Sequence, residues 1–228
     1  MLKPKRTILS KEIKRDPFLE SIVSIKTHIT EKKQIYTRIA LSATILLVLG
    51  SIFIRNQEEN RDIAEGLLSK AMIYIDLNDE ENATIHLQEL IDEFESTESG
   101  KNASFYLGRI YLNKNDFNLA LPYFERYIGK GNNPLLIGAA YQAMVNIYLS
   151  QLDLKNAIYH QKMSIEYSNS KEERAWASLR LANLSLAIGD KSSALKLVNR
   201  VLDEFTENAA LTQRANEING KIGHIGES

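Results

Sequence analysis

Cysteine is absent from the 228 residues of this chain, and proline, histidine and tryptophan are scarce, with four, four and one copies. Without a thiol the protein cannot form a disulfide framework, a thiolate metal site or a cysteine nucleophile. It also cannot carry the lipid of a lipoprotein, which is attached to a cysteine. Because proteins of any compartment can lack cysteine, this absence does not select a compartment.

Sequence motifs for catalysis are absent as well. The chain has no His-Glu-x-x-His string, no Gly-x-Ser-x-Gly string and no phosphate-binding loop. Its histidines are His28, His86, His160 and His224. The carboxylates are scattered, as on the exterior of an acidic protein. We therefore predict that the protein is not an enzyme, and that it has no catalytic, cofactor-binding or metal-ligating residues.

Charge divides the chain into three parts, although the net charge of the whole is only −1. Residues 1–38 carry a net charge of +6, residues 39–54 carry no charged side chain, and residues 55–228 carry a net charge of −7. An acidic domain repels the phosphates of nucleic acids, so we do not expect nucleic-acid binding.

The uncharged part reads IALSATILLVLGSIFI and lies between Arg38 and Arg55. Sixteen helical residues span about 24 Å, which is less than the hydrocarbon core of a bilayer, about 30 Å thick. A longer helix over 36–55 can cross it, with Tyr36 at the interface and Arg38 extended to the headgroups. We predict a transmembrane anchor there. A buried core helix, or a signal peptide cleaved near Val48 and Gly50, are the alternatives.

Basic residues gather on the N-terminal side of this predicted anchor. The residues that we expect to set its orientation are Lys26, Lys32, Lys33 and Arg38. On the other side, acidic residues balance the arginines. The positive-inside rule then predicts a cytoplasmic N-terminus and a C-terminal part outside the cytoplasm. In a bacterium this is a single-pass protein of the inner membrane with a periplasmic domain.

Residues 1–35 form a basic segment that is too short to bury a core of its own. Asp16 and Pro17 suit the cap and the first position of a helix. The apolar residues that follow fall on one helical face: Phe18, Ile22, Ile25 and Ile29. Three interpretations stay open, namely a solvated helix, an amphipathic helix on anionic lipid, and a helix that packs on a partner protein.

The C-terminal part repeats itself with a period of 37 residues. An aspartate and, four residues later, an alanine recur in each period: Asp79, Ala83, Asp116, Ala120, Asp153, Ala157, Asp190 and Ala194. Other columns keep the same period: Ala71, Gly108, Val145 and Ala182; Tyr74, Tyr111 and Tyr148; Ile73, Ile110, Ile147 and Leu184. His86 and His160 lie two periods apart, so we expect equivalent structural positions rather than a catalytic pair.

Apolar spacing within each period is helical and predicts two antiparallel helices, the second capped by the aspartate. The four units are expected over 64–100, 101–137, 138–174 and 175–211. Residues 56–63 are a linker or a helix extension, and 207–228 form a capping helix and tail. The predicted fold is all-α, with a single N-terminal transmembrane helix followed by a helical solenoid of about four helix-turn-helix repeats.

The second unit resembles the tetratricopeptide repeat. The matching residues are Leu107, Gly108, Tyr111, Asn115, Asp116, Phe117, Ala120 and Phe124. The period of 37 residues is longer than the roughly 34 residues typical of that family. The resemblance implies a groove, lined by the first helix of each unit, for an extended peptide or a partner helix. The implied groove residues are Leu68, Met72, Ile75, Phe105, Arg109, Leu112, Gln142, Asn146, Leu149, Trp176, Arg180, Asn183 and Leu186.

The order of basic segment, single anchor and repeat domain is similar to that of the ancillary SecYEG translocon subunits of the YfgM-like family. This resemblance implies a protein beside the translocon that contacts translocon subunits, nascent chains and a membrane-anchored chaperone. It implies no small-molecule substrate. The alternative is an envelope scaffold that links the inner membrane to a cell-division or outer-membrane assembly complex.

Overall fold

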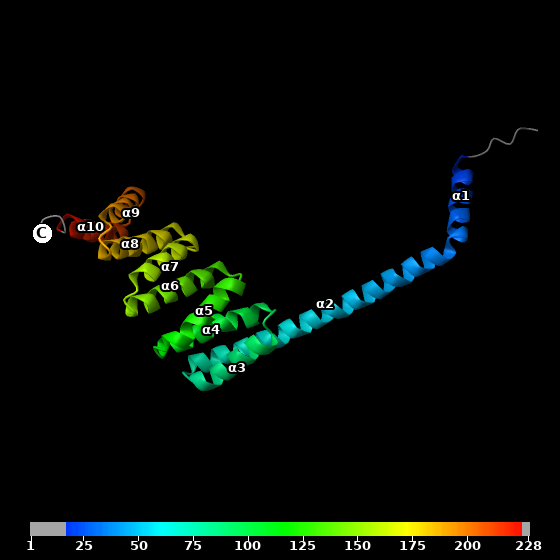
Figure 1. The fold of residues 1–228 in the computed structure, drawn as a ribbon, viewed down its shortest axis with the longest axis horizontal. Coiled ribbons are helices and arrows are strands. Elements are labelled where there is room, and N and C mark those ends of the chain that lie inside the picture. The colour runs from blue at the N-terminus through cyan, green and yellow to red at the C-terminus, as the bar shows by residue number, and fades with distance from the viewer. Residues whose placement is uncertain (1–16, 225–228) are drawn as a thin grey trace, which may run out of the picture. The chain divides into compact units, whose positions relative to one another are not determined.

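The computed structural model describes residues 17–224, which contain ten α-helices and no β-strand (Figure 1). The all-α expectation is therefore confirmed for these residues. The expected cap Asp16 lies outside the described residues. The helices are α1 (Pro17–Glu31), α2 (Lys33–Asp76), α3 (Glu80–Glu93), α4 (Glu98–Asn113), α5 (Phe117–Lys130), α6 (Pro134–Ser150), α7 (Leu154–Glu166), α8 (Lys171–Ala187), α9 (Lys191–Glu204) and α10 (Ala209–His224).

The chain divides into two units, Met1–Gln57 and Glu58–Ser228. The described part of the first unit contains α1 and the beginning of α2, and the second unit contains the end of α2 and helices α3 to α10. Residues 56–63 are helical, because α2 continues through them without a break. Arg61 reaches forward one turn in this segment, with its Nε atom 3.7 Å from Oε1 of Glu65.

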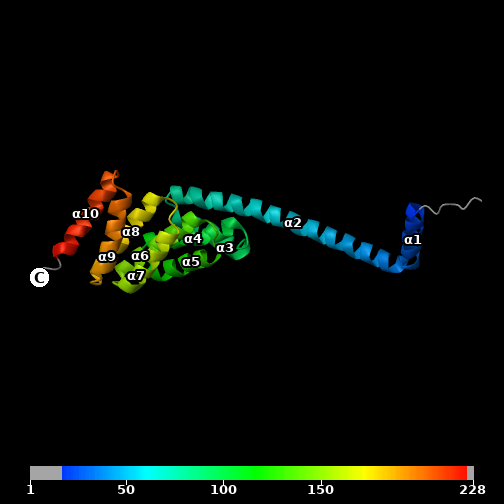
Figure 2. The ribbon, with the colours of Figure 1, turned by 90° about the horizontal axis from the view of Figure 1, so that it is seen from above.

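Four helical hairpins followed by one helix make up the second unit (Figure 2). The end of α2 pairs with α3 through a shared apolar cluster that contains Ala71 and Ala83. The other hairpins pair α4 with α5, α6 with α7, and α8 with α9. Each hairpin packs on the next, and α4 also contacts α6 directly. This stacking of helix pairs is the architecture of a helical repeat solenoid, in which neighbouring repeats bury one continuous core.

The same turn joins the two helices of every hairpin. Four residues spaced by 37 have a positive φ angle: Asn78 (56°), Asn115 (59°), Leu152 (58°) and Gly189 (81°). The N–H of the aspartate that follows each of them donates to the carbonyl five residues earlier, at 2.8 to 2.9 Å. This is the helix-ending motif that glycine and asparagine favour. Leu152 adopts the same left-handed backbone conformation, although leucine tolerates a positive φ angle less well than glycine or asparagine does.

Each aspartate then caps the second helix of its hairpin, as the sequence predicts. The Oδ1 atom of each aspartate accepts a hydrogen bond from the backbone N–H of the residue three positions later. The N···O distances in the four hairpins are 3.2, 3.2, 3.0 and 3.0 Å. At Asp79, hydrogen bonds from the side chain and then the backbone of Asn82 lower the pKa of the carboxyl group. A capping oxygen of this kind stabilises a helix by about 1 kcal/mol.

Small residues allow the two helices of each hairpin to approach closely. The alanine column is fully buried at Ala83, Ala120, Ala157 and Ala194. At Gly108, an added Cβ atom would lie only 2.9 Å from a ring carbon of Phe124, which is itself fully buried. Glycine is therefore required where the facing helix presents an aromatic ring.

The last helix covers the C-terminal end of the solenoid. In α10, Leu211, Ala215 and Ile218 are fully buried in the same cluster as residues of α8 and α9. Most of the remaining α10 residues are exposed, and the exposed ones are polar or small. This helix has the two faces expected of a terminal cap, one apolar and packed, the other polar.

The first hairpin has no such cover. Ile73 of α2 is 58% exposed, whereas the equivalent residues of the later hairpins, Ile110, Ile147 and Leu184, are 3%, 0% and 9% exposed. Each later hairpin has a preceding hairpin to pack on, whereas no hairpin precedes the first among residues 17–224. Ile63 of α2 is exposed as well, whereas Ile137, its equivalent in the third hairpin, is 8% exposed. We refer to Ile63 and Ile73 as the leading edge.

Candidate functional site

The first helices of the hairpins share one accessible face. Three residues at spacing i, i+4 and i+7 contribute to it from each hairpin, and all but Ala143 are at least partly exposed. We refer to these residues as the first-helix face: Glu65, Ser69, Met72, Asn102, Tyr106, Arg109, Ala139, Ala143, Asn146, Trp176, Arg180 and Asn183.

Six of the predicted groove residues lie on this face. They are Met72, Arg109, Asn146, Trp176, Arg180 and Asn183. The Trp176 side chain is 39% exposed, between two alanines that are nearly completely buried. The guanidinium carbon of Arg109 lies 6.0 Å from the ring centre of Phe105. This cation–π contact positions the charged guanidinium group itself, and the Arg109 side chain stays exposed.

The prediction for Phe105 is wrong. Its side chain is 4% exposed and packs against Phe124 and Tyr127, with ring centres 5.9 and 5.6 Å away. It belongs to the core between the second and third hairpins rather than to an open groove. The register of the fourth hairpin also needs correction, because the residue equivalent to Phe105 is Leu179, 1% exposed, and not Arg180.

The aliphatic members of the predicted groove are half-buried. Each packs against a hydrophobic core cluster of the solenoid: Leu68, Ile75, Leu112, Leu149 and Leu186. Gln142 is also half-buried, and its Oε1 atom has no hydrogen-bond partner among the described residues. These side chains fill the space between hairpins and contribute less free surface than the sequence suggested.

Sequence reasoning missed part of the face that lies around Trp176. The residues one, two and three periods before this tryptophan are Ala139, Asn102 and Glu65, and none of them is buried. Tyr106 lies two periods before Arg180, and it is also not buried. Subtracting the 37-residue period from Trp176 would have found the first three, because equivalent positions in a repeat point the same way.

The histidines on the second helices have a structural role. Three hairpins stack two rings across the helix pair: Tyr74 on His86, Tyr111 on Tyr123, and Tyr148 on His160, with ring centres 5.5, 5.6 and 5.1 Å apart. Burial lowers the pKa of His160, which favours its neutral form. The ring column follows the 37-residue period and explains why His86 and His160 are two periods apart.

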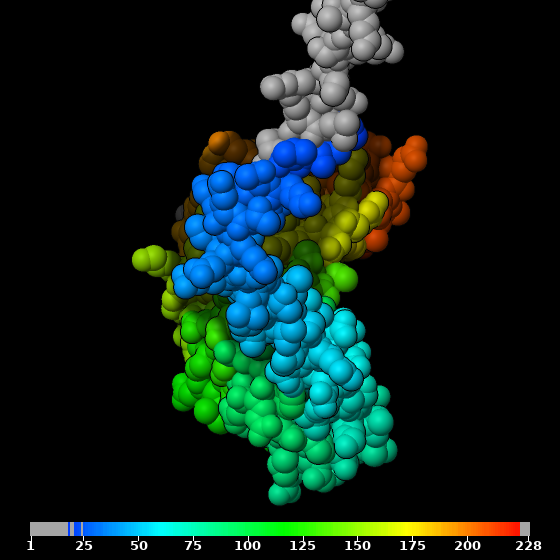
Figure 3. Space-filling model, turned by 90° about the vertical axis from the view of Figure 1, so that its right-hand side faces the viewer, coloured from blue at the N-terminus to red at the C-terminus, as the bar shows by residue number. Residues whose placement is uncertain are grey.

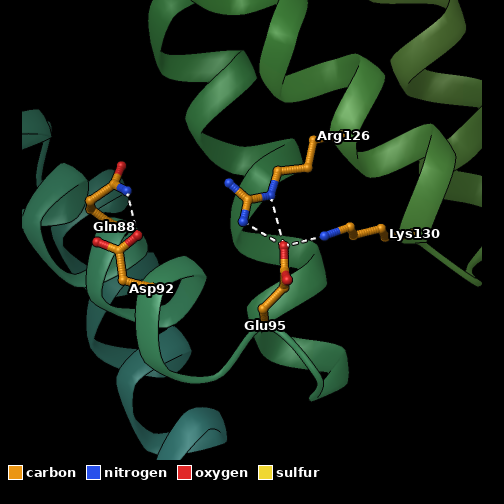
Figure 4. A network of polar contacts seen from close by, with 5 residues as sticks. All are labelled: Gln88, Asp92, Glu95, Arg126 and Lys130. Carbon is orange, nitrogen blue, oxygen red and sulfur yellow. Dashed lines mark hydrogen bonds and ion pairs between the residues drawn. The ribbon is translucent and has the colours of Figure 1, made fainter.

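A network of charges ties the first hairpin to the second (Figure 4). Glu95, in the loop after α3, accepts hydrogen bonds from Arg126 and Lys130 of α5. The Arg126 Nε atom lies 3.0 Å from Glu95 Oε1. Hydrogen bonds from Lys130 and then Arg126 lower the pKa of Glu95 to about 2. These two cations are therefore engaged within the protein.

The apolar part of α2 is exposed to its surroundings. Among the described residues, α2 is the one helix long and apolar enough to cross a membrane, and none of its apolar window is buried. Leu46 and Leu47 are 70% and 75% exposed, which contradicts a buried core helix. Figure 3 shows the blue to cyan part of the chain, which contains α2, facing the viewer. The hydroxyl groups of Thr44 and Ser51 donate to carbonyls of their own helix. A signal sequence near the N-terminus passes the same test of length and apolar composition.

The described residues contain no cluster of three or more histidines, aspartates or glutamates placed to hold a metal ion. A family model for the tetratricopeptide repeat matches residues 103–129, which lie in α4, the turn and α5. No curated protein sequence matches the chain. The chain therefore contains a tetratricopeptide repeat, and such repeats are typically non-enzymatic modules that bind proteins or peptides.

Proposed function

We propose that the protein is a membrane-anchored, non-enzymatic module that binds proteins or extended peptides through the first-helix face. The observation that carries this proposal is the accessibility of Arg109, Asn146 and Trp176 on three successive first helices. Tryptophan and arginine are the side chains that most often dominate binding energy at protein interfaces. A face of mixed aromatic, amide and cationic character suits an extended peptide or a partner helix.

In this proposal, residues 36–55 of α2 anchor the module in a bacterial inner membrane. The basic residues before them retain the N-terminus in the cytoplasm, so the solenoid lies in the periplasm. Reversing the charges of Lys32, Lys33 and Arg38 together should disturb this topology. The measurement is protease protection of the C-terminal domain in intact spheroplasts, and unchanged protection contradicts the assignment. The mass of the mature full-length protein separates an anchor from a cleaved signal peptide.

The finer assignment within this proposal is an ancillary subunit of the SecYEG translocon, of the YfgM-like type. It rests on the similar order of basic segment, anchor and repeat domain. Its partners are translocon subunits, emerging polypeptides and a membrane-anchored chaperone. Tethering the face near a channel exit raises its effective concentration to about the millimolar range. Weak contacts with many different sequences are then sufficient for binding.

Photo-crosslinking in cells from positions 109, 146 and 176 tests this assignment. Positions 159 and 195 are exposed on the second helices α7 and α9 and are matched controls. Adducts with translocon subunits, a chaperone and many nascent chains support the ancillary-subunit role. A single dominant envelope protein supports a scaffold instead. Equal adduct yields at the first-helix face and at the control positions contradict a binding role for this face.

Truncation of the two most informative side chains gives a second test. Trp176→Ala and Asn146→Ala should each weaken partner binding at least about fivefold, which corresponds to a hot-spot loss of about 1 kcal/mol. Thermal unfolding of the full-length variants should stay cooperative. Tyr159→Ala is the control, because it also removes an exposed aromatic side chain, but from a second helix. Loss of cooperative unfolding would show that the two residues are structural.

The leading edge favours the scaffold as a second candidate function. Ile63 and Ile73 are 46% and 58% exposed, whereas their equivalents in the third hairpin, Ile137 and Ile147, are 8% and 0% exposed. A preceding hairpin would therefore cover these two isoleucines in a longer solenoid. A stable partner that completes the repeat stack would bury this apolar surface. Ile73→Glu should abolish a stoichiometric complex of this kind and leave binding at the first-helix face unchanged.

A further inference from the structure

α1 carries an exposed apolar stripe with a distinct polarity around it. Ile22, Ile25 and Ile29 fall at spacing i, i+3 and i+7 and are 46%, 59% and 48% exposed. Helical spacing places Lys26 beside this stripe and Glu31 on the opposite side of α1. An apolar stripe flanked by a cation, with the anionic side chain turned away, is the pattern of a helix at a lipid interface.

The stripe opens into the corner where α1 meets α2. The chain turns at Lys32, whose N–H donates to the carbonyl of His28 at 3.2 Å, and α1 leaves the axis of α2 in both ribbon views (Figures 1 and 2). Ile25, His28, Ile29 and Tyr36 line an open space of about 690 Å³ in this corner. The apolar side of α1 therefore faces the side along which α2 departs.

The threonines of α1 need little water. The hydroxyl of Thr27 donates to the carbonyl of Val23, and the hydroxyl of Thr30 donates to the carbonyl of Lys26, both at 2.7 Å. Hydroxyl donors satisfied within their own helix can enter a less polar environment without losing a hydrogen bond. Thr27 lies one turn before Glu31, on the side of α1 away from the stripe, so these bonds do not decide which side of the helix meets lipid.

We propose that α1 is an interfacial helix that lies on the cytoplasmic leaflet and inserts its apolar stripe into an anionic phospholipid surface. This inference rests on the proposed anchor. When α2 enters the bilayer near Tyr36, the side of α1 that faces along α2 is the side that faces the lipid. Lys26 beside the stripe and Lys32 and Lys33 at the turn then meet phosphate headgroups. A protein partner in the cytoplasm would instead require the apolar stripe on the opposite side of α1.

The absence of cysteine makes this inference directly testable, because a single introduced cysteine can carry the only probe. Full-length Ile29→Cys, Glu31→Cys and Leu47→Cys variants are labelled with an environment-sensitive fluorophore. They are placed in nanodiscs, which leave both membrane faces accessible. One nanodisc contains phosphatidylcholine with phosphatidylglycerol, and the other contains phosphatidylcholine alone. The readouts are the emission maximum and quenching by a lipid-borne quencher.

We expect the probe at position 29 to emit at shorter wavelength and to be quenched several-fold more strongly than the probe at position 31. Omitting phosphatidylglycerol should reduce this difference, and adding Ile22→Ser with Ile25→Ser should remove it. Equal, water-like signals at positions 29 and 31 in both nanodiscs overturn the inference. Protection of position 29 in native membranes but not in nanodiscs also overturns it, in favour of a protein partner.

The probe at position 47 distinguishes this failure from a failure of the proposed function. If position 47 is in lipid and position 29 is in water, the anchor stands and the interfacial role of α1 is wrong. If position 47 is also in water, the anchor itself is wrong.

Discussion

Replacing Leu152 by glycine should stabilise the solenoid. Leu152 occupies the turn of the third hairpin with a φ angle of 58°, in the column where the other hairpins have asparagine or glycine. Its side chain is 86% exposed, so it contributes little apolar burial that the substitution would remove. The backbone strain therefore decides the sign of the effect.

The magnitude follows from two opposing contributions. A residue with a Cβ atom costs roughly 1–2 kcal/mol in the left-handed conformation. Glycine avoids that cost but loses about 0.5–1 kcal/mol more conformational entropy on folding. The net stabilisation by Leu152→Gly is therefore about 0–1.5 kcal/mol, which raises the Tm of a domain of this size by up to about 6 °C. Leu152→Asn, which copies the first two hairpins, should act in the same direction.

Thermal unfolding of the full-length protein in detergent, followed by far-UV circular dichroism, measures this shift. Gly189→Leu is the mirror control, because Gly189 has a φ angle of 81° and nothing within 4 Å of an added Cβ atom. This variant should lose about 0–1.5 kcal/mol of stability, because backbone strain costs roughly 1–2 kcal/mol and the smaller entropy loss of leucine on folding returns about 0.5–1 kcal/mol. A lower Tm for Leu152→Gly, or a higher Tm for Gly189→Leu, would refute the reasoning.

Three further substitutions test the packing and the charges of the solenoid. Gly108→Ala should lower the Tm, because overpacking against Phe124 costs about 1–3 kcal/mol and better helix propensity returns at most about 1 kcal/mol. The double variant Gly108→Ala with Phe124→Leu should recover part of the loss. If the effects of the two substitutions on stability were strictly additive, the contact would be contradicted. Glu95→Gln should lower the Tm at pH 7. Since the pKa of Glu95 falls from 4.5 to about 2 in the folded protein, this difference should persist above pH 4.5 and vanish as the pH approaches 2. Gln161→Leu should raise stability by about 1 kcal/mol, because Gln161 is fully buried and its Oε1 atom has no partner among the described residues; a lower Tm would show that the bond from Nε2 to the carbonyl of Ala177, 3.0 Å long, outweighs that cost.

The candidate site was only partly predictable from the sequence. Repeat spacing identifies which residues belong to first helices, and so it found Arg109 and Asn146. It could not separate these from Phe105, which lies on the same helix only four residues before Arg109 but is buried. The difference arises because the side chain at position 105 meets the rings of Phe124 and Tyr127 on the facing helix. The spacing of residues along one helix does not predict which side chains of a neighbouring helix they contact.

The sequence by itself determined the local features of this protein. The helical hairpins and their capping aspartates depend on residues a few positions apart, and the 37-residue period is visible in the sequence itself. These features can therefore be predicted before the fold is known. The tertiary structure alone decided what neighbouring hairpins cover. Ile73 and Ile147 occupy the same column, yet one is 58% exposed and the other is fully buried. The physical reason is that burial depends on whether another hairpin packs on that side, and in the described part of the chain no hairpin precedes the first.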